Sequence, residues 1–329
     1  MVRSSILAPG LVLVLWSSAP ADVTLRQTST IKLPSFIPPE FQAELREQLQ
    51  RSMPAETLLR IRGEKTYQSY GPLAAIADYG RNEVTLLDPK GKRYARVPLA
   101  EFGDRLAAAL KASVSGGVGQ PLAQTPSFDV AAKKTGQVAP IQGIRAEESL
   151  TEISMQMAPM TQIPAGPFDA AFSTLRLEMR SWVAQAAEIR RMPELKELAE
   201  YTERSMRAID PDEFFNRALS TVPGFTEQLG ATIYKLAKST GGLTLRVSTA
   251  VYMPAISQLL QLAAEGAPTG FDPDAPMAEA LMDVAEISTE RVPDTAFIVP
   301  SEYHEAPFEE LVKGAIQTPV ALSPATPRR

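Results

Sequence analysis

The sequence contains no cysteine and, in 329 residues, a single histidine, His304. Without cysteine there can be no disulfide, thiolate metal site, cysteine nucleophile or lipid attached to an N-terminal cysteine. A Ser-His-Asp triad would have to use His304, and the sequence has no Gly-x-Ser-x-Gly turn. We therefore interpret His304 as a surface or edge-strand residue. We expect a protein that is not an enzyme and that uses neither a metal nor a cofactor.

Charge of one sign is not concentrated anywhere in the chain. There are 33 Lys and Arg residues against 38 Asp and Glu residues, which gives a formal net charge of −5. Proteins that bind nucleic acids carry basic patches or stripes, so we expect no nucleic-acid partner. Hydrophobic residues make up 44% of the chain, which is ordinary for a globular protein with a large core.

Long hydrophobic runs are also missing, apart from one near the start. Residues 6–16 form an apolar run that Pro9 and Gly10 interrupt, and about 20 apolar residues are needed to span a bilayer. Arg3 precedes this run and the small residues 19–21 follow it, which is the pattern of a signal peptide. We expect cleavage after Ala21 and a periplasmic or secreted mature chain. The alternative is an uncleaved membrane anchor.

Residues 58–98 form a series of short β-favouring runs. The runs are separated by turn-forming residues, among them Gly63, Gly71, Gly80 and Gly91. The predicted strands are residues 58–62, 65–70, 74–79, 83–87 and 92–97. Connections this short join only antiparallel neighbours, because a parallel crossover needs a dozen or more residues. This stretch therefore predicts an antiparallel meander.

The rest of the chain alternates between strand and helix patterns. Apolar and polar residues alternate, or short apolar runs occur, at residues 22–33, 128–134, 144–157, 173–184, 243–252, 278–291 and 297–300, with a turn at 135–143. Helical spacing of apolar residues occurs at 41–53, 99–110, 193–209, 225–236 and 254–265. Each helix has one apolar stripe that needs a surface to cover. We expect an α+β fold, an antiparallel β half-barrel of about ten strands with amphipathic helices across its concave face.

Several short motifs occur in an order that resembles a known group of proteins. They are DVTLRQ (22–27), IADY (76–79), VTLLDPKGKRY (84–94), IQGIRAEE (141–148), MRSWV (179–183), PELKEL (193–198) and FIVPSEY (297–303). Together they resemble an uncharacterised family of secreted bacterial proteins related to the periplasmic lipoprotein carriers (LolA/LppX/LolB-like). The resemblance covers most of residues 22–305. It implies a half-barrel with helices across its mouth and, as in the characterised relatives, a cavity for acyl chains.

The resemblance also sets the expected domain organisation. We expect a signal peptide at residues 1–21 and a single LolA-like domain at residues 22–306. Helical insertions at 193–239 and 254–276 depart from the family pattern. Residues 307–329 are expected to form a short helix and a Pro/Thr/Ser/Ala-rich disordered tail.

Apolar residues of the strands and helices are the candidates for a ligand site. Methionine is flexible and polarisable and suits a surface that accepts varied apolar ligands, although ordinary core packing also explains such residues. Trp182 lies on the polar face of its strand, either under a helix or as part of a binding surface. The candidate ligand-binding residues are Met155, Met157, Leu175, Leu177, Met179, Leu245, Val247, Leu195, Leu198, Phe225 and Leu229.

We therefore expect an exported periplasmic binding protein that holds an acyl chain, lipid or lipoprotein between sheet and helices, with peripheral contacts to the cell envelope. The alternative is a non-catalytic structural or interaction protein of the envelope, whose helices fill the concave face. The sequence leaves the oligomeric state open.

Overall fold

The computed structural model of the protein describes residues 22–34, 37, 42–43, 46, 54–115, 127–156, 174–208, 242–253 and 275–316. The strands are β1 (Val23–Lys32), β2 (Glu56–Arg62), β3 (Lys65–Tyr70), β4 (Leu73–Asp78), β5 (Glu83–Asp88), β6 (Arg93–Pro98), β7 (Ser127–Ile141), β8 (Ile144–Gln156), β9 (Thr174–Ala184), β10 (Leu243–Tyr252), β11 (Ala278–Ser288) and β12 (His304–Glu305). The helices are α2 (Leu99–Ser115), α3 (Ala186–Ile189), α4 (Lys196–Ala208) and α8 (Phe308–Ile316), with 3₁₀ turns η2 (Pro193–Leu195) and η3 (Asp294–Phe297).

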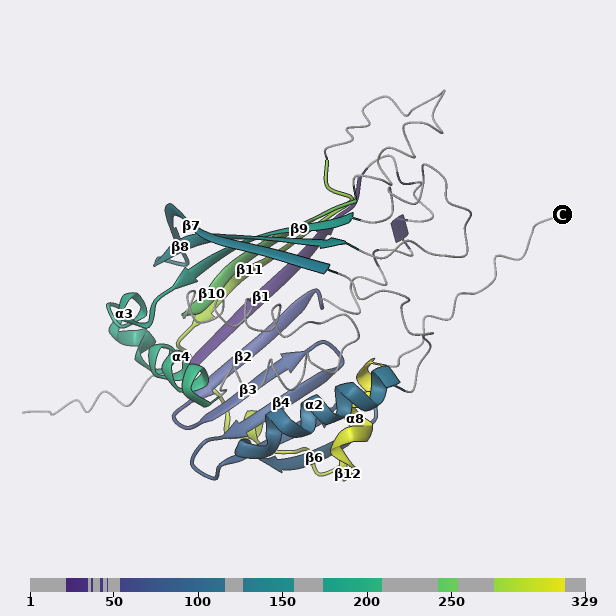
Figure 1. The fold of residues 1–329 in the computed structure, drawn as a ribbon. Helices are drawn as coiled ribbons and strands as arrows, with labels where there is room; N and C mark the ends of the chain where they lie inside the picture. Colours follow the sequence, from purple (N-terminus) through teal and green to yellow (C-terminus); the bar gives the residue numbers. More distant parts are fainter. Residues whose placement is uncertain are drawn as a thin grey trace, which may run out of the picture.

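All twelve strands belong to one open sheet, so the fold is α+β and mostly strand. Their order is β12-β6-β5-β4-β3-β2-β1-β11-β10-β9-β8-β7, and neighbours are antiparallel except for the parallel pair β12 and β6. Figure 1 shows β2–β6 as one half of the sheet and β7–β11 as the other, with β1 between them. Twelve strands are thus described where the sequence predicts about ten.

The meander predicted from residues 58–98 is confirmed as β2–β6. Its strands pair with their sequence neighbours. Gly63 and Gly71 have φ angles of +54° and +57° in the turns after β2 and β3, a left-handed conformation that glycine adopts without steric cost. The turn after β5 is held by the Gly91 N–H, which donates to Oδ1 of Asp88 at 2.8 Å. Local turn chemistry therefore determines this half of the sheet.

The hairpin of β7 and β8 is longer than the sequence predicts. Residues 135–143 were expected to form a turn, but β7 continues to Ile141 and only Gln142 and Gly143 turn the chain. The pairing register shifts between Lys134 and Val138, where Gly136 has a φ of +80°. A bulge of this kind accommodates glycine inside a continuing strand, which is why the turn prediction was wrong.

Helices α2 and α8 pack together against β5 and β6. Phe308 and Leu311 of α8 are each only 1% exposed and share a cluster with Val97 of β6. The rings of Phe102 and Phe308 meet edge to face, with centroids 5.8 Å apart. The short helix expected after residue 306 therefore contributes its apolar face to the core.

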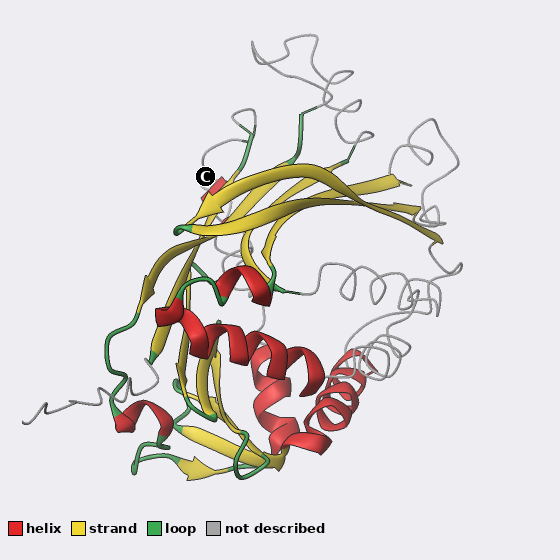
Figure 2. Ribbon diagram, turned by 90° about the vertical axis from the view of Figure 1, so that its left-hand side faces the viewer, coloured by secondary structure: helices red, strands yellow, loops and turns green. Residues whose placement is uncertain are grey.

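A second cluster joins α3, η2 and α4 to the middle of the sheet. Leu198 of α4 is fully buried with Ile61 of β2 and Leu245 of β10. Trp182 packs against the same cluster, together with Ile189 of α3, which favours the first of its two expected roles. Leu59 and Ile61 share a sheet face with Ala75 and Ala77 through the β2–β3–β4 pairing. The part of this cluster on β2 therefore lies on the same face as the cluster of α2 and α8 (Figure 2).

The segment between β11 and β12 packs on the other face of the meander. Val292 and Phe297 are buried there against Ile76 and Leu87. A strand was predicted at residues 297–300, but η3 ends at Phe297 and β12 begins only at His304. Pro300 has no N–H to donate to a strand ladder, which accounts for the error. The His304 N–H instead donates to the Lys92 carbonyl oxygen at 3.0 Å.

Several predictions fall outside the described residues. They concern the signal peptide at 1–21, most of the helix at 41–53, the second part of the insertion at 193–239, most of the insertion at 254–276, and the tail from residue 317. Within the first insertion, residues 193–208 form η2 and α4. The remaining strand and helix predictions agree with the described elements to within a few residues.

Candidate functional site

A stretch of one face of strands β8–β11 has no charged residue. On β8 this stretch begins at Ser149, because Arg145 and Glu147 lie on the same face nearer the start of the strand. Cross-strand pairing aligns the side chains of this stretch in three rows. The rows are Ile153, Leu177, Val251 and Ala278; Thr151, Met179, Thr249 and Ala280; and Ser149, Ser181, Val247 and Met282. We call these residues the uncharged face. Met155 and Leu175 extend it by a further row, and Ser29 and Ile31 of β1 extend two rows sideways.

The size of this face follows from strand geometry. Neighbouring strands lie about 4.8 Å apart, and residues on one face recur about every 6.8 Å along a strand. Including β1 and the additional row, the face extends about 20 Å in each direction. A segment of acyl chain could lie against such an area in extended form.

The reverse face of the same strands is charged. Its charged residues are Glu148, Glu152, Arg176, Glu178, Arg180, Arg246, Glu279 and Asp283. Arg180 pairs with Glu178 at 2.7 Å and lies 3.8 Å from Glu148, and Arg246 pairs with Asp283 at 2.7 Å. Since successive side chains in a strand point to opposite faces, this alternation places the charged residues of β9, β10 and β11 on one side together with Glu148 and Glu152 of β8. Arg145 and Glu147, nearer the start of β8, lie on the other side.

The uncharged face is largely screened from water, but it belongs to no core cluster of the described residues. Ser149 and Thr151 are 7% and 2% exposed, and the other members are half-buried. The cluster around α4 begins where the uncharged face ends, and it includes Leu245 and Val284, at 0% and 2% exposure. Leu245 and Val284 at the α4 end of these strands are therefore buried, whereas most residues of the uncharged face keep some exposure.

The structure brings together five of the predicted ligand-site residues. They are Met155, Leu175, Leu177, Met179 and Val247, all on or directly beside the uncharged face. Leu195, Leu198 and Leu245 lie instead in the α4 cluster, at 0–3% exposure, where no surface is left to contact a ligand. Met157, Phe225 and Leu229 lie outside the described residues.

The contribution of β11 was missed by sequence reasoning. Ala278, Ala280 and Met282 complete the three rows. A signal was present, because these residues alternate with Glu279 and Asp283 in the sequence. The local pattern does not show which strand pairs with β11, because β11 pairs with β1 from the opposite end of the chain.

Helix α4 is attached to the meander through two charged side chains. Arg204 donates from Nη2 to the Gly63 carbonyl oxygen at 2.7 Å and lies over the Tyr79 ring at 5.5 Å. Glu197 is 5% exposed and its buried Oε2 has no hydrogen-bond partner among the described residues. Burial, reinforced by the nearby Glu200 carboxylate, raises the pKa of Glu197, although Arg204 and a hydrogen bond from the Gly63 N–H oppose this. The attachment therefore includes one carboxylate that burial destabilises.

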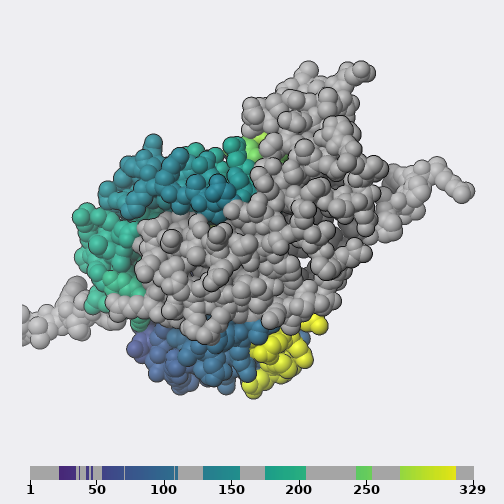
Figure 3. All heavy atoms as spheres, viewed as in Figure 1, coloured from purple at the N-terminus to yellow at the C-terminus, as the bar shows by residue number. Residues whose placement is uncertain are grey.

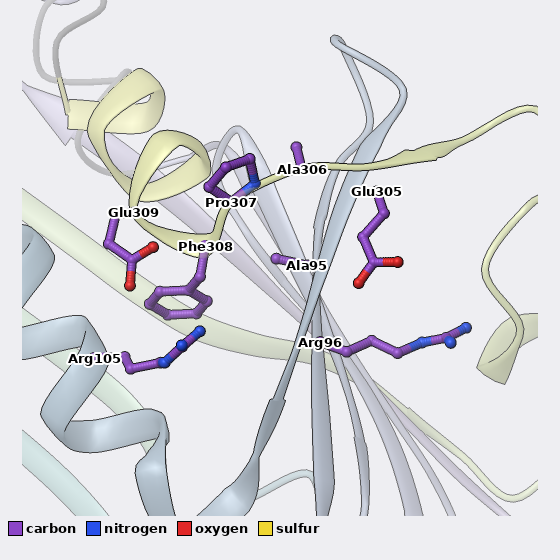
Figure 4. Close-up of a pocket in the computed structure, with 8 residues that line it drawn as sticks. All are labelled: Ala95, Arg96, Arg105, Glu305, Ala306, Pro307, Phe308 and Glu309. Carbon is purple, nitrogen blue, oxygen red and sulfur yellow. The ribbon is translucent and has the colours of Figure 1, made fainter.

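A shallow hollow of about 440 Å³ lies between β6, α2 and the start of α8 (Figure 4). It is lined by Ala95, Arg96, Arg105, Glu305, Ala306, Pro307, Phe308 and Glu309. Arg96 lies 3.9 Å from Glu83 and Arg105 lies 3.8 Å from Glu101. Both arginines are thus partly neutralised, and the lining mixes charges of both signs.

Features of other function classes are weak in the described parts of the chain. His304 is exposed on the edge strand β12, as the sequence predicts. Within those parts, no three His, Asp or Glu residues come close enough to hold a metal ion, and no helix has the length and apolarity needed to cross a membrane. No family model matches the chain, and no curated protein matches it either. The resemblance to lipoprotein carriers stays a prediction.

Proposed function

We propose that the protein is an exported carrier or binding protein that holds an acyl chain, as part of a lipid or lipoprotein, against the uncharged face. The observation that carries this proposal is the segregation of charge across β8–β11. The reverse face has eight charged residues, counted from Glu148 to Asp283, whereas the three rows of the uncharged face have none and end on β8 at Glu147. A face that met only water would not need to exclude charge so completely.

The proposed architecture is a half-barrel. The sheet is bent (Figure 2), and we place α2, α4 and α8 across its concave side, where their clusters pack. The α4 cluster would close one end of the hollow, and α2 with α8 would cover β5 and β6. The uncharged face, on β8–β11 beyond both clusters, would line the space that receives the ligand.

The chemistry of the face fits an acyl chain better than a polar ligand. Its groups are aliphatic or thioether side chains and small hydroxyls, and burial of apolar surface is favourable without directional contacts. Each buried methylene contributes about 0.8 kcal/mol, so ten methylenes would contribute about 8 kcal/mol before the costs of binding. Because the face offers no charge for a headgroup, we expect selection by chain rather than by headgroup.

The alternative is a structural or interaction protein of the cell envelope whose own side chains fill the concave side. Its specific support is the burial of Thr151 and Ser149, at 2% and 7% exposure. In that case the uncharged face would be ordinary core, and the chain would act through contacts of its outer surface.

The experiment that separates these functions is lipid analysis of the purified protein. The full chain is expressed in a bacterium that exports it, purified from the periplasm and analysed by native mass spectrometry and by organic extraction. We expect co-purifying acyl species in about stoichiometric amount, and rebinding of a fluorescent fatty acid after delipidation. A protein that carries no acyl species and takes up no probe would support the filled-core alternative. The intact mass also shows whether residues 1–21 are removed.

A further inference from the structure

The sheet ends at a long edge strand, β7, whose outer side has no partner strand in the described structure. Among the described strands, β7 pairs only with β8, whereas the opposite edge is the two-residue strand β12. Asp129 and residues 131–134 are exposed, and the space-filling view shows the β7–β9 region at the surface (Figure 3). Edge strands present unpaired backbone N–H and C=O groups, and proteins usually protect them.

The backbone features that block edge pairing lie in the second half of β7. That half contains the register shift between Lys134 and Val138, Gly136 in a left-handed conformation, and Pro140, which has no N–H. Bulges and prolines are known means of blocking edge pairing. Residues 127–134, in contrast, pair with β8 in unbroken register. The first half of β7 therefore keeps a regular edge.

The exposed charges of this first half are self-complementary. Asp129, Ala131 and Lys133 alternate along one face of β7. If two copies pair antiparallel about Ala131, Asp129 of each copy lies opposite Lys133 of the other, and directly opposed residues point to the same face. Neither Asp129 nor Lys133 has an ion-pair partner among the described residues, whereas Lys134 pairs with Glu147 at 3.8 Å.

We propose that β7 is a homodimerisation edge, where a second copy of the chain adds its own β7 in antiparallel register centred on Ala131. Two symmetric Asp129–Lys133 pairs would fix this register. In the same register, Val130 and Ala132 lie opposite each other on the face that continues the rows of Ile153 and Thr151. The dimer therefore joins the two sheets and brings the uncharged faces of the copies side by side. This inference does not depend on what the face binds.

The contact is limited to one strand from each copy, so we expect a weak dimer with a Kd in about the micromolar range. With Asp129→Lys, the new lysine of each copy lies opposite Lys133 of the other copy, so the dimer contains two pairs of opposed lysines. With Lys133→Asp, the new aspartate of each copy lies opposite Asp129 of the other, so the dimer contains two pairs of opposed aspartates. Because opposite charges stabilise and like charges destabilise a directly opposed pair, each single variant should raise Kd by about tenfold or more.

The test is sedimentation velocity of the full chain over a range of concentrations. We expect the wild type to dimerise and each single variant to stay largely monomeric. A mixture of the two single variants should form a one-to-one heterodimer, because a copy with lysine at both positions then faces a copy with aspartate at both. The double variant D129K/K133D should dimerise again. Lys90→Asp, an equal change of charge in the exposed turn after β5, serves as the control and should dimerise as the wild type does.

Two results would overturn the proposal. One is a wild type that stays monomeric at all concentrations tested. The other is a wild-type dimer that both single variants form equally well, which would place the interface elsewhere. Circular dichroism of each variant shows that it is folded, and the heterodimer of the two single variants shows that neither has lost its edge strand.

Discussion

A pair of substitutions on β10 tests whether the two faces of the sheet differ as proposed. Val247 and Ser248 are adjacent in the sequence and lie on opposite faces. Val247 lies between Ser181 and Met282 on the uncharged face, and Ser248 lies between Arg180 and Leu281 on the charged face. Val247→Glu and Ser248→Glu introduce the same side chain into the same strand, one residue apart.

The expected effects differ because the surroundings differ. At position 247 a carboxylate would displace about two methylenes of a bound chain, which removes about 1.6 kcal/mol. It would also lose water without gaining a partner, at a further cost of about 1–3 kcal/mol. Together these terms predict binding roughly 100-fold weaker or more. At position 248 the new carboxylate faces Arg180 and solvent, so acyl binding should change less than about twofold.

The assay is titration of the delipidated protein with a fluorescent fatty acid, with urea unfolding of each variant as the measure of stability. The reasoning is refuted if both variants bind the probe as the wild type does. It is also refuted if Ser248→Glu weakens binding as much as Val247→Glu, because the face would then not determine the effect. If Val247→Glu lowers stability by several kcal/mol and the wild type binds no probe, position 247 belongs to a filled core.

Three further predictions concern the stability of the fold and are measured by urea unfolding. Phe308→Ala should destabilise the protein by about 3–5 kcal/mol, because it removes a fully buried ring from the α2–α8 cluster; a cost below about 1 kcal/mol would show that α8 is not part of the core. Although burial opposes them, hydrogen bonds from the Gly91 N–H and from Arg93 lower the pKa of Asp88. Asp88→Asn should therefore lower the free energy of unfolding by about 1–2 kcal/mol at pH 7. This difference between wild type and variant should disappear as the pH falls through the folded-state pKa of Asp88. An equal difference at low and neutral pH would contradict that linkage. Burial raises the pKa of Glu197, so the charged form of this side chain destabilises the fold at neutral pH. Glu197→Gln should therefore raise the free energy of unfolding by about 1 kcal/mol at pH 8, and should change it little below the unfolded-state pKa of about 4. A loss of stability at pH 8 would show that the Arg204 attraction outweighs burial.

The local part of the fold could be predicted from the sequence. Each turn of the meander has its own glycine, and the alternation of residues 173–184 gives β9 nearly to the residue. Alternation in residues 173–184 and 243–252 identified Leu175, Leu177, Met179 and Val247 as apolar positions, and the structure places them on or beside one face. These features depend only on neighbours in the sequence, so composition and period are enough to find them.

The remaining features depend on contacts that are distant in the sequence. The pairing of β1 with β11 joins the two ends of the chain, and no local pattern specifies that partner. Leu195, Leu198 and Leu245 have the same hydrophobic character as the uncharged face, but long-range packing places them in the α4 cluster. The turn predicted at 135–143 failed because Gly136 occupies a bulge, a conformation that composition alone does not distinguish from a turn.

The most direct test of the central claim is to map where a bound acyl chain lies. The protein is loaded with a fatty acid that carries a photoreactive diazirine in its chain, irradiated, digested and analysed by mass spectrometry. The account predicts labelling of peptides that contain β9, β10 and β11, with Met179, Val247 and Met282 among the modified residues. Labelling concentrated on the hollow beside Phe308 and Arg105, or equal labelling of the native and urea-unfolded protein, would contradict it.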